Sequence, residues 1–355
     1  MGISGLHSFL APVLKKVNIR EYKGKTLGID GHAWLHRGLY RCGMELLTNT
    51  QTEKHLTYCA EKAKRLLAKG ITPVFVFDGE NIPLKDNTNE ERASQREKNK
   101  ELFLRMDKND RRRPFYAAKA VDVSSAMVQE LVILLQKAEI RSIVSPYEAD
   151  AQLAHLEKTK VIDAVITEDS DLILFGCKKV LFKLDDRGMA DEFCSRRLYC
   201  CAKPDLKNMS HNEFIQMCIM SGCDYLKNIP GLGLKTAYAL FKKNGTLDAV
   251  RAEVESIPKY KIPENYWEDF RMAEVAFKHY IVYDTAEKCR VHMAQIDDSV
   301  LKEMGDVSFL GSLEETEESL PAEFTVLSGV PSEKRIRTEK IIDESPYFKK
   351  TDISK

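Results

Sequence analysis

The sequence lacks the patterns that mark membrane, secreted and zinc-binding proteins. No apolar run approaches the roughly 20 residues that a membrane helix needs. The N-terminus has no basic stretch followed by an apolar core, as a secretory signal would have. The nine cysteines include no C-x-x-C pair. We therefore expect reduced thiols in a cytosolic or nuclear protein, without a disulfide framework or a zinc site.

An excess of charge of either sign is also missing. The chain has 54 Lys and Arg residues and 54 Asp and Glu residues, so its formal net charge is zero. Any attraction to nucleic acid must therefore come from local segregation of charge. The 355 residues suffice for one large domain or two ordinary ones, and 43% hydrophobic with 30% charged residues suits a globular protein.

The chain does have several apolar, strand-like runs that end in a carboxylate. Three such runs lead directly into acids, and two further sets of acids stand at predicted helix boundaries. These acids are Asp30, Asp78, Glu148, Asp150, Asp169, Asp171 and Asp224. Ligands of open α/β sheets bind beyond the carboxyl ends of the strands. We therefore expect the seven acids to share one edge of one sheet.

A cluster of this kind is costly unless cations share it. Two carboxylates about 4 Å apart repel by roughly 4 kcal/mol at an effective dielectric constant near 20. Hard divalent cations with oxygen ligands, Mg²⁺ or Mn²⁺, would relieve the repulsion. Two such ions about 4 Å apart make a centre that cleaves phosphodiester bonds.

Strands and helices alternate along the chain. We predict buried strands over 26–30, 73–78, 140–144, 163–167 and 179–184. We predict helices over 52–69, 124–138 and 147–158. This alternation predicts an α/β fold with a central, mostly parallel, doubly wound sheet.

The start of the helix predicted at 147 gives Glu148 two possible roles. Ser145 suits the N-cap, Pro146 suits the first turn, and Glu148 stands three residues after Ser145. That spacing is typical of a capping box. Glu148 could therefore cap the helix, bind a metal or do both.

Residues 85–119 form a basic insertion shortly after Asp78. They contain eleven Lys or Arg residues and seven Asp or Glu residues, with few apolar positions. Long structured segments beside a site are usually functional. A solvated helical pair held by i,i+4 contacts would have the same composition, so composition leaves both interpretations open.

A glycine turn follows Asp224. Gly231 and Gly233 precede a predicted helix that carries Lys235 and Thr236 near its start. Backbone N–H groups at such a start bind phosphate without contacting bases. An ordinary helix start would use the same glycines for its turn, so this choice also stays open.

The C-terminal part divides into a helix and a tail. Residues 264–284 look helical, and we interpret their aromatic side chains as core packing in preference to base stacking. Periodicity is lost from about residue 299, and short acidic and basic runs follow. We expect residues 291–355 to be a loosely ordered tail.

Taken together, the motifs resemble the flap-endonuclease superfamily of structure-specific 5′ nucleases over about residues 1–290. They are Met1-Gly2-Ile3-Ser4-Gly5-Leu6, Ile29-Asp30, Val76-Phe77-Asp78-Gly79, Pro146-Tyr147-Glu148-Ala149-Asp150-Ala151-Gln152-Leu153-Ala154, Ile166-Thr167-Glu168-Asp169-Ser170-Asp171-Leu172, Ser221-Gly222-Cys223-Asp224-Tyr225-Leu226 and the turn at 231–233. Within that superfamily, the sequences of the motifs around Glu148 and Asp171 are most similar to those of the exonuclease 1 family.

The resemblance implies a PIN-like sheet in a single nuclease domain over residues 1–290. Its parts would be an N-terminal region (1–100) with a helical arch at about 80–125, an internal region (130–225) and a helical duplex-binding region (226–290). The last region would contain a helix–two-turn–helix element.

The resemblance also implies roles for individual residues. The seven acids named above match ligands of two Mg²⁺ ions, for which Mn²⁺ can substitute, whereas Glu168 matches none. Lys85 and Arg92 match the catalytic basic pair that grips the scissile phosphate. The DNA-binding set is Gly2, His32, His36, Arg96, Gly231, Gly233, Lys235 and Thr236. The glycine turn and Lys235 match the element that holds duplex backbone with K⁺.

The sequence departs from flap endonucleases at two points. His36 stands where those enzymes carry a stacking tyrosine, and members of the exonuclease 1 family share this histidine. Either His32 or His36 could instead be an ordinary residue of a helix face. The motif Q-x-x-(aliphatic)-x-x-(aromatic pair), which binds sliding clamps, is absent from the sequence.

We therefore expect a metal-dependent 5′→3′ exonuclease of double-stranded DNA that also cuts 5′ flaps. Its substrates would be DNA with 5′ ends, gaps or flaps. It would act as a monomer in the nucleus, in DNA repair, with mismatch-repair proteins as possible partners and without membrane contact. Three alternatives remain: a replicative-type flap endonuclease, a non-catalytic DNA-end-binding protein, and an RNA-directed nuclease. A binding protein would gain by losing the repulsion among the acids, which argues against the second.

Overall fold

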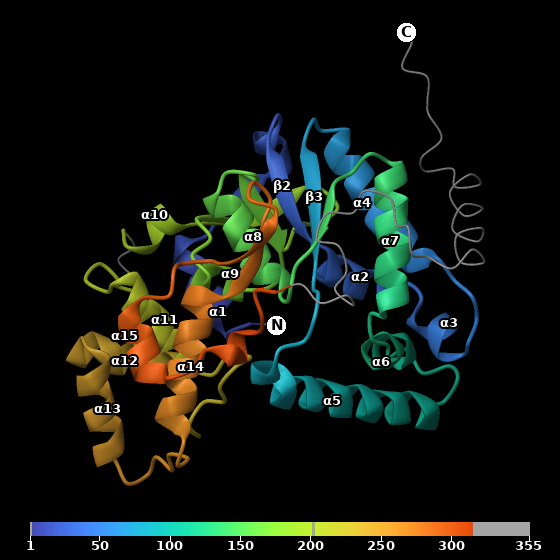
Figure 1. Cartoon of the computed structure of the whole chain (residues 1–355). Coiled ribbons are helices and arrows are strands. Elements are labelled where there is room, and N and C mark those ends of the chain that lie inside the picture. The colour runs from blue at the N-terminus through green and yellow to red at the C-terminus, as the bar shows by residue number, and fades with distance from the viewer. Residues whose placement is uncertain (1, 201–202, 315–355) are drawn as a thin grey trace.

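The structure, a computed structural model, describes residues 2–200 and 203–314. Its centre is a seven-stranded sheet with the strand order β1-β7-β6-β5-β2-β3-β4 (Figure 1). The strands are β1 (Lys15–Asn18), β2 (Thr26–Asp30), β3 (Thr72–Phe77), β4 (Ser142–Val144), β5 (Ala164–Thr167), β6 (Lys179–Phe182) and β7 (Met189–Cys194). The pairs among β2 to β6 are parallel, which confirms the predicted α/β sheet.

Two strands at one side of the sheet were not predicted. Strand β7 pairs antiparallel with β6, and β1 pairs antiparallel with β7. Three of the four residues of β1 are at least partly exposed, and both strands contain charged residues. Strands with this composition lack the apolar run that marks the parallel, doubly covered strands.

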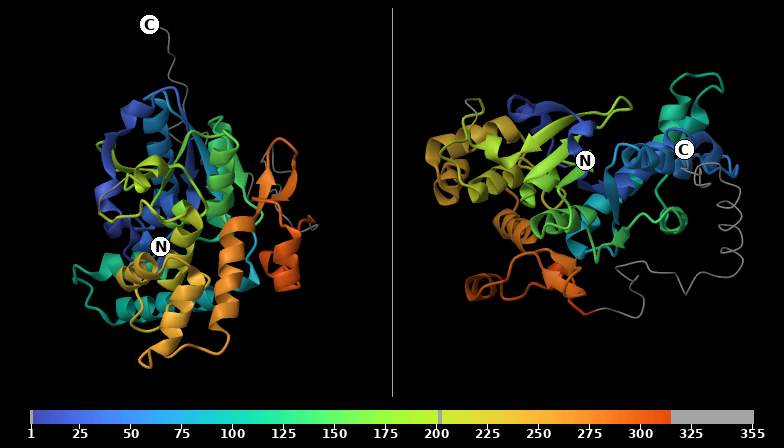
Figure 2. Two further views of the ribbon diagram at one scale, coloured as in Figure 1. Left: turned by 90° about the vertical axis from the view of Figure 1, so that its left-hand side faces the viewer. Right: turned by 90° about the horizontal axis from the view of Figure 1, so that it is seen from above.

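Strand β3 shows why the central strands are apolar at successive positions. Val74 and Val76 belong to one core cluster, and Phe75 and Phe77 belong to another. Successive side chains of a strand point to opposite faces, so both faces of this sheet are covered. The helices of the Phe75 cluster are α2 (Gly31–Leu39), α4 (Lys54–Leu67) and α7 (Ser125–Lys137). Those of the Val74 cluster include α8 (Ala149–Lys158), α9 (Asp171–Leu174), α11 (His211–Met220) and α14 (Tyr266–His279) (Figure 2).

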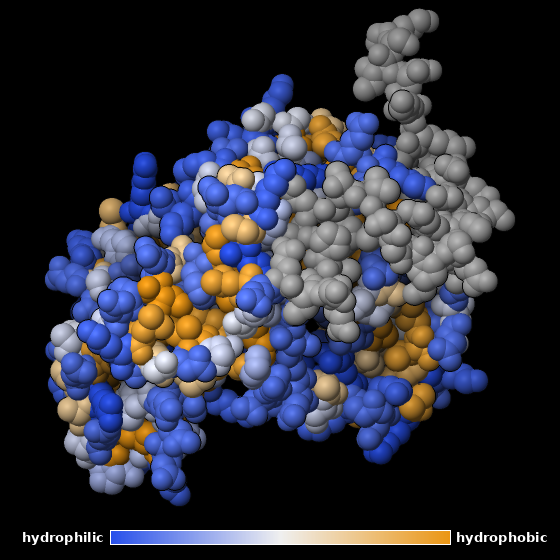
Figure 3. Space-filling view, in the orientation of Figure 1, coloured by the Kyte–Doolittle hydropathy of each residue, from blue (hydrophilic) through white to orange (hydrophobic). Residues whose placement is uncertain are grey.

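The basic insertion is a pair of helices that extends away from the sheet (Figure 1). A short 3-10 turn, η3 (Pro83–Lys85), leads into α5 (Asp86–Arg105), and α6 (Arg113–Ala120) packs back against α5 and against α3 (Gly43–Leu47). Only Asn99 and Phe103 are buried among the 20 residues of α5. The surface of this helix is correspondingly hydrophilic (Figure 3).

The C-terminal region differs from its prediction in two places. The helix predicted over 264–284 ends at His279, and Ile281–Asp284 form strand β8, which pairs with β9 (Cys289–His292). Regular structure continues past residue 290, through β9 to α15 (Asp298–Met304), so the boundary placed at 290 falls inside a strand. The predicted tail beyond residue 314 lies outside the described residues.

The remaining elements are short or lie between residues 226 and 290. They are α1 (Leu6–Phe9), η1 (Ala11–Val13), η2 (Ile19–Tyr22), α10 (Ser195–Leu198), α12 (Leu234–Asn244), α13 (Leu247–Ser256) and η4 (Ser308–Leu310). Within residues 2–200 and 203–314, no helix has the length and apolar character needed to span a membrane.

Candidate active site

Two of the predicted acids stand at the carboxyl ends of neighbouring parallel strands. Asp30 ends β2, where its Oδ1 accepts the Ala33 N–H at 2.8 Å and caps α2. Its Oδ2 accepts the Thr167 hydroxyl at 3.0 Å. Asp78 follows β3, and its Oδ1 accepts the N–H of Ala149, the first residue of α8, at 2.8 Å. Parallel pairing of β2 with β3 therefore brings both acids to one edge, as the sequence predicted.

The capping-box role considered for Glu148 is wrong. The Ser145 hydroxyl donates to the backbone oxygens of Phe77 and Tyr147, at 2.8 and 2.9 Å, and does not cap α8. Glu148 itself occupies the N-cap position, but its carboxylate makes no capping hydrogen bond. Because Asp78 supplies the cap from another strand, the carboxylate of Glu148 is available for other contacts.

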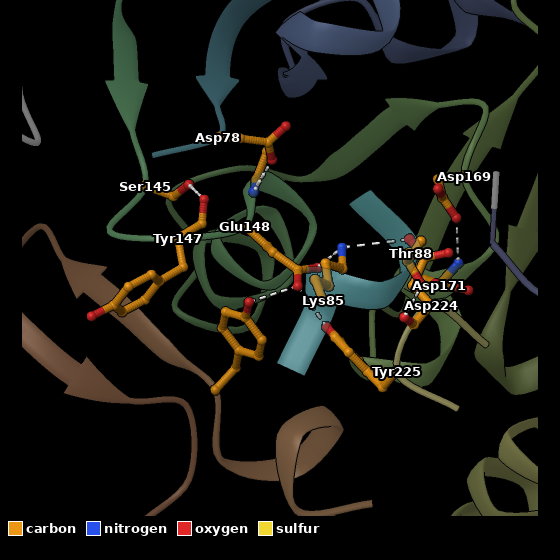
Figure 4. Close-up of polar contacts among 12 residues, drawn as sticks. Asp78, Lys85, Thr88, Ser145, Tyr147, Glu148, Asp169, Asp171, Asp224 and Tyr225 are labelled. Atoms are coloured by element: carbon orange, nitrogen blue, oxygen red, sulfur yellow. Dashed lines mark hydrogen bonds and ion pairs between the residues drawn. The ribbon is translucent and has the colours of Figure 1, made fainter. Parts of the chain in front are cut away.

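Glu148 faces a cation and two phenols (Figure 4). Its Oε2 lies 2.7 Å from Lys85 Nζ. Its Oε1 accepts the hydroxyls of Tyr280 at 2.6 Å and Tyr225 at 2.9 Å. Lys85 Nζ also lies 3.5 Å from an oxygen of Asp224, so this ammonium group joins two of the predicted metal ligands.

Asp224 is bound mainly by the base of the arch, which is η3 together with the first turns of α5. Arg92 Nη2 lies 2.6 Å from its Oδ2, and the Thr88 hydroxyl donates to its backbone oxygen at 2.6 Å. Burial alone would raise the pKa of Asp224, but the charges of Lys85 and Arg92 lower it below the ordinary value. The predicted catalytic pair therefore lies against the predicted metal ligands, and it neutralises two of them.

The acids that do not pair with Lys85 or Arg92 show the opposite pKa shift. Burial, and then the charges of Asp169 and Asp30, raises the pKa of Asp150 well above its ordinary value. Burial, Asp169 and Asp224 likewise raise the pKa of Asp171. Because the charge of one acid raises the pKa of another, these acids lie close enough to repel one another.

Asp30 and Asp169 follow the same trend. Burial raises the pKa of Asp30 to about 6, although the Ala33 N–H opposes the shift. Burial also raises the pKa of Asp169. A group of carboxylates whose pKa values rise together is short of positive charge.

The donors of this cluster fit hard divalent cations. They are carboxylate oxygens, which Mg²⁺ and Mn²⁺ prefer. Oδ1 of Asp150 is buried and has no hydrogen-bond partner among residues 2–200 and 203–314. In the described residues, however, no three acid, imidazole or thiol groups are arranged to hold one ion. The ammonium of Lys85 lies between Glu148 and Asp224 instead, so metal binding by both residues requires Lys85 to move aside.

Gly2 lies directly against the cluster. A Cβ atom built on Gly2 would come within 2.2 Å of Asp169 Oδ1 and 2.8 Å of Asp171 Oδ1. The backbone there has φ of +71°, which favours glycine. The neighbouring Ile3 N–H donates to Asp171 Oδ1 at 3.1 Å. The structure therefore puts Gly2 beside the acids, where the resemblance implied it.

Two of the predicted DNA-binding residues, His32 and Arg96, have protein partners. His32 Nδ1 accepts the Asp78 N–H at 3.1 Å. Arg96 pairs with Asp122 at 3.0 Å. Burial lowers the pKa of His36 on α2, which favours a neutral imidazole there. His32 thus contacts a predicted metal ligand in addition to occupying a helix face.

The glycine turn leads into helix α12, which is neither part of the sheet nor part of the arch. Gly231 has φ of +85°, and Gly233 is the N-cap of α12. Lys235 is exposed in the first turn, and Thr236 is half-buried. Residues 225–230 connect Asp224 to this turn.

Sequence reasoning missed the residues that surround Glu148 and Asp224. Tyr225 follows Asp224 directly, and its place in that motif was an available signal. Tyr280 was interpreted as core packing, and Thr88 was not considered. A hydroxyl whose partner lies 132 residues away leaves no local pattern, so Tyr280 could not have been found from sequence periodicity.

Comparison with known families decides which kind of protein carries this geometry. The XPG N-terminal domain matches residues 1–99, and the XPG I-region matches residues 139–224. The two matches contain all seven acids together with Lys85 and Arg92.

The chain belongs to the XPG family. It is 37% identical over 302 residues to exonuclease 1 of Arabidopsis thaliana, which covers 84% of this chain and 41% of that protein. It is 38% identical over 297 residues to exodeoxyribonuclease 1 of Schizosaccharomyces pombe (strain 972 / ATCC 24843), covering 83% and 52%. The chain thus spans about half the length of these XPG relatives, or less.

Solved structures share the fold. The catalytic core of Rad2 in complex with DNA substrate has a TM-score of 0.60 at 21% identity, covering 78% of this chain and 86% of that one. The Holliday junction-resolving enzyme GEN1, in complex with product DNA, Mg²⁺ and Mn²⁺ ions, has a TM-score of 0.54 at 19% identity, covering 81% and 66%. Both likenesses concern the XPG fold alone.

Proposed function

We propose that this chain is a metal-dependent nuclease that digests double-stranded DNA from 5′ ends in the 5′→3′ direction and also cuts 5′ flaps. The observation that carries the proposal is the gathering of buried acids at the carboxyl edge of the sheet, with Lys85 and Arg92 of the arch base directly against them. The 37–38% identity to proteins named exonuclease 1 and exodeoxyribonuclease 1 supports the 5′→3′ assignment.

Two divalent ions would be held by the seven predicted acids. Mg²⁺ is the proposed ion and Mn²⁺ a substitute, which agrees with the ions described in the GEN1 complex. When bound, such ions would supply Lewis acidity and positive charge at the reacting phosphodiester. Oδ1 of Asp150, buried and without a hydrogen-bond partner in the part of the chain that the structure describes, would gain a partner from them.

Lys85 and Arg92 would bind and orient the scissile phosphate. In the structure they neutralise Glu148 and Asp224, and a phosphate would offer them an alternative anion. Positive charge aimed at a phosphate is most useful where charge develops in the transition state. Gly2 would let the reacting strand approach Asp169 closely, because there is no side chain at that position.

The other predicted contacts would position the duplex. Gly231, Gly233, Lys235 and Thr236 would bind backbone phosphate at the start of α12, with K⁺ shared between protein and DNA. His32, His36 and Arg96 would lie along the strand near the cut. We further propose that the protein acts as a monomer in the nucleus, in repair reactions such as mismatch repair and end resection.

The test uses purified protein, Mg²⁺ and DNA substrates labelled at either end. Blunt, recessed, flapped, single-stranded and RNA-containing substrates are compared, and Asp171→Ala is the inactive control that should still bind DNA. We expect short products from the 5′-labelled duplex end first, and flap cutting at a comparable or lower rate.

Release from the 3′ label first would overturn the polarity, and much faster flap cutting would favour a replicative-type flap endonuclease. Wild-type turnover by Asp171→Ala would contradict the two-metal assignment.

A further inference from the structure

Tyr280 connects the C-terminal region to a predicted metal ligand. It follows the last residue of α14, precedes β8 and is fully buried. Its hydroxyl donates to Glu148 Oε1 at 2.6 Å, and Tyr225 donates to the same oxygen at 2.9 Å. Tyr280 lies outside both regions that match the XPG family, 1–99 and 139–224.

Two donors on one oxygen fix the orientation of the carboxylate. Glu148 is not held by a helix-capping bond, so its side chain would otherwise be free to rotate. With Oε1 occupied by two phenols, Oε2 is the oxygen directed at the cation position, where Lys85 Nζ now lies at 2.7 Å. Hydrogen bonds to a ligating carboxylate orient it toward its metal in the same way.

The ring of Tyr280 is itself held rigidly. Phe175 packs edge-to-face against it, with ring centroids 5.8 Å apart at 87°. The Tyr147 ring meets it at 6.5 Å, and the Tyr225 ring lies at the same distance. A side chain packed on several sides by aromatic rings has little freedom to withdraw its hydroxyl from Glu148.

The strand after Tyr280 is tied to the helix that Glu148 begins. On α8, the side-chain amide of Gln152 donates to the backbone oxygen of Tyr283 at 2.8 Å and accepts the N–H of the same residue at 2.7 Å. One turn further along α8, His155 Nε2 lies 3.0 Å from an oxygen of Asp284. Because β8 and α8 are fastened in this way, the start of β8 is fixed relative to the start of α8.

We propose that Tyr280 is a positioning residue for the nuclease reaction: its hydroxyl, with that of Tyr225, holds Glu148 so that Oε2 faces the metal position. The proposal rests on the proposed function for the identity of the site. It assigns the segment after α14 a part in metal binding in addition to its part in packing.

The experiment compares Tyr280→Phe with Tyr266→Phe in the full chain. Both residues are almost completely buried tyrosines of the α14 region, but the Tyr266 hydroxyl has no hydrogen-bond partner in the described structure. Each variant loses one buried hydroxyl and keeps its ring. The readouts are direct Mn²⁺ binding by titration calorimetry, the Mg²⁺ concentration for half-maximal single-turnover cleavage, the Kd for DNA and the melting temperature.

We expect Tyr280→Phe to weaken Mn²⁺ binding and to raise the half-maximal Mg²⁺ concentration by about tenfold, the lower end of the effect of losing a partner of a metal ligand. The Kd for DNA should stay unchanged, and Tyr266→Phe should match the wild type. Tyr225→Phe, which removes the other donor, should shift metal binding in the same direction.

A purely structural role for Tyr280 predicts a different result. Its loss would then lower the melting temperature while leaving Mn²⁺ binding equal to that of Tyr266→Phe, and this outcome overturns the proposal. Because Mn²⁺ binding is measured without DNA, the test is distinct from that of the proposed function. If wild-type protein bound Mn²⁺ but did not cut 5′ ends, the proposed function would fail while the role of Tyr280 could still be judged.

Discussion

At the scale of single residues, the site stores unfavourable electrostatic energy in its buried acids. Burial raises the pKa of Asp30 to about 6, compared with about 3.9 for an unperturbed aspartate. In the unfolded chain, Asp30 loses its proton near the lower of these two pH values. As the pH rises from about 4 to about 6, the unfolded state is therefore favoured, and stability is lost across this window.

We therefore predict that Asp30→Asn changes how stability depends on pH. In metal-free buffer the wild-type free energy of unfolding should fall between about pH 4 and pH 6, by about 3 kcal/mol for a pKa difference of about two units. Asp30→Asn should lack that part of the fall, because the amide does not ionise. Urea unfolding at a series of pH values in EDTA measures both curves, and parallel curves would show that Asp30 does not titrate in this range.

The gathering of acids at one edge of the sheet could be expected from the sequence, whereas their hydrogen-bond and ion-pair partners could not. Each acid follows a local signal, such as the apolar run before Asp78, and parallel strands bring such ends together. The partners of Glu148 depend on packing between distant segments, since Tyr280 is 132 residues away and Lys85 is on the arch base. The capping-box interpretation failed for a similar reason: the Ser145 hydroxyl donates to backbone oxygens instead, and Asp78, which follows β3, accepts the Ala149 N–H at the start of α8.

At the scale of elements, the arch base makes the closest contact with the site. We predict that Lys85→Ala and Arg92→Ala each lower the single-turnover rate by roughly 100- to 1000-fold, as the loss of a transition-state donor does. DNA affinity should fall much less, because most phosphate contacts would remain. Rapid-quench cleavage and equilibrium binding separate the two effects.

Arg105→Ala is the matched control for the arch. Arg105 lies at the far end of the same helix and is 77% exposed. It pairs across one turn with Glu101. Its loss should leave the cleavage rate close to that of the wild type. If Lys85→Ala and Arg92→Ala weakened binding alone, the pair would serve electrostatic steering and not the reaction.

The start of α12 should act on the duplex and not on the cut. Lys235→Ala is expected to weaken binding to long duplexes and to lower the slope of log affinity against log salt by about one. Lys243→Ala, at the other end of α12 and paired with Glu253 at 2.9 Å, should have a smaller effect. Fluorescence anisotropy over a salt series makes the measurement, and equal losses on long and very short duplexes would contradict this placement.

Elements with strong local patterns were predicted well. The parallel strands and the helices α4, α7 and α8 were found because their apolar spacing is regular. Strands β1 and β7 were missed because both carry charged residues, which interrupt the apolar run that marks a buried strand. The change from α14 to β8 was missed because Ile281–Asp284 continue an apolar run that suits either structure.

At the scale of the whole molecule, internal cations pair with acids that we propose as metal ligands. Lys85 is about 18% exposed and bridges Glu148 and Asp224, and losing one partner of such a buried pair costs about 3 kcal/mol or more. We predict that Lys85→Ala lowers the melting temperature in EDTA. Mg²⁺ should raise the melting temperature of this variant more than that of the wild type, because a ligand of the folded state alone stabilises it.

Differential scanning fluorimetry with a Mg²⁺ series makes this comparison, and Arg105→Ala again serves as the control. A smaller Mg²⁺ shift in Lys85→Ala than in the wild type would mean that the lysine helps to hold the ions and does not stand in for them. The overall arrangement of sheet and arch was foreseeable from the sequence. The position of Lys85 between Glu148 and Asp224 was not, because it depends on where a flexible lysine side chain comes to lie.

The sparse burial of α5 has a consequence for the timescale on which the molecule opens. Only Asn99 and Phe103 of its 20 residues are buried, so most of its backbone hydrogen bonds are backed by solvent and not by a core. Segments of this kind open locally at a small fraction of the global unfolding free energy. Amide deuterium uptake should therefore be faster along Asp86–Arg105 than in β3. DNA that binds to the arch should then slow amide exchange in α5, and this slowing can be measured before any bond is cut.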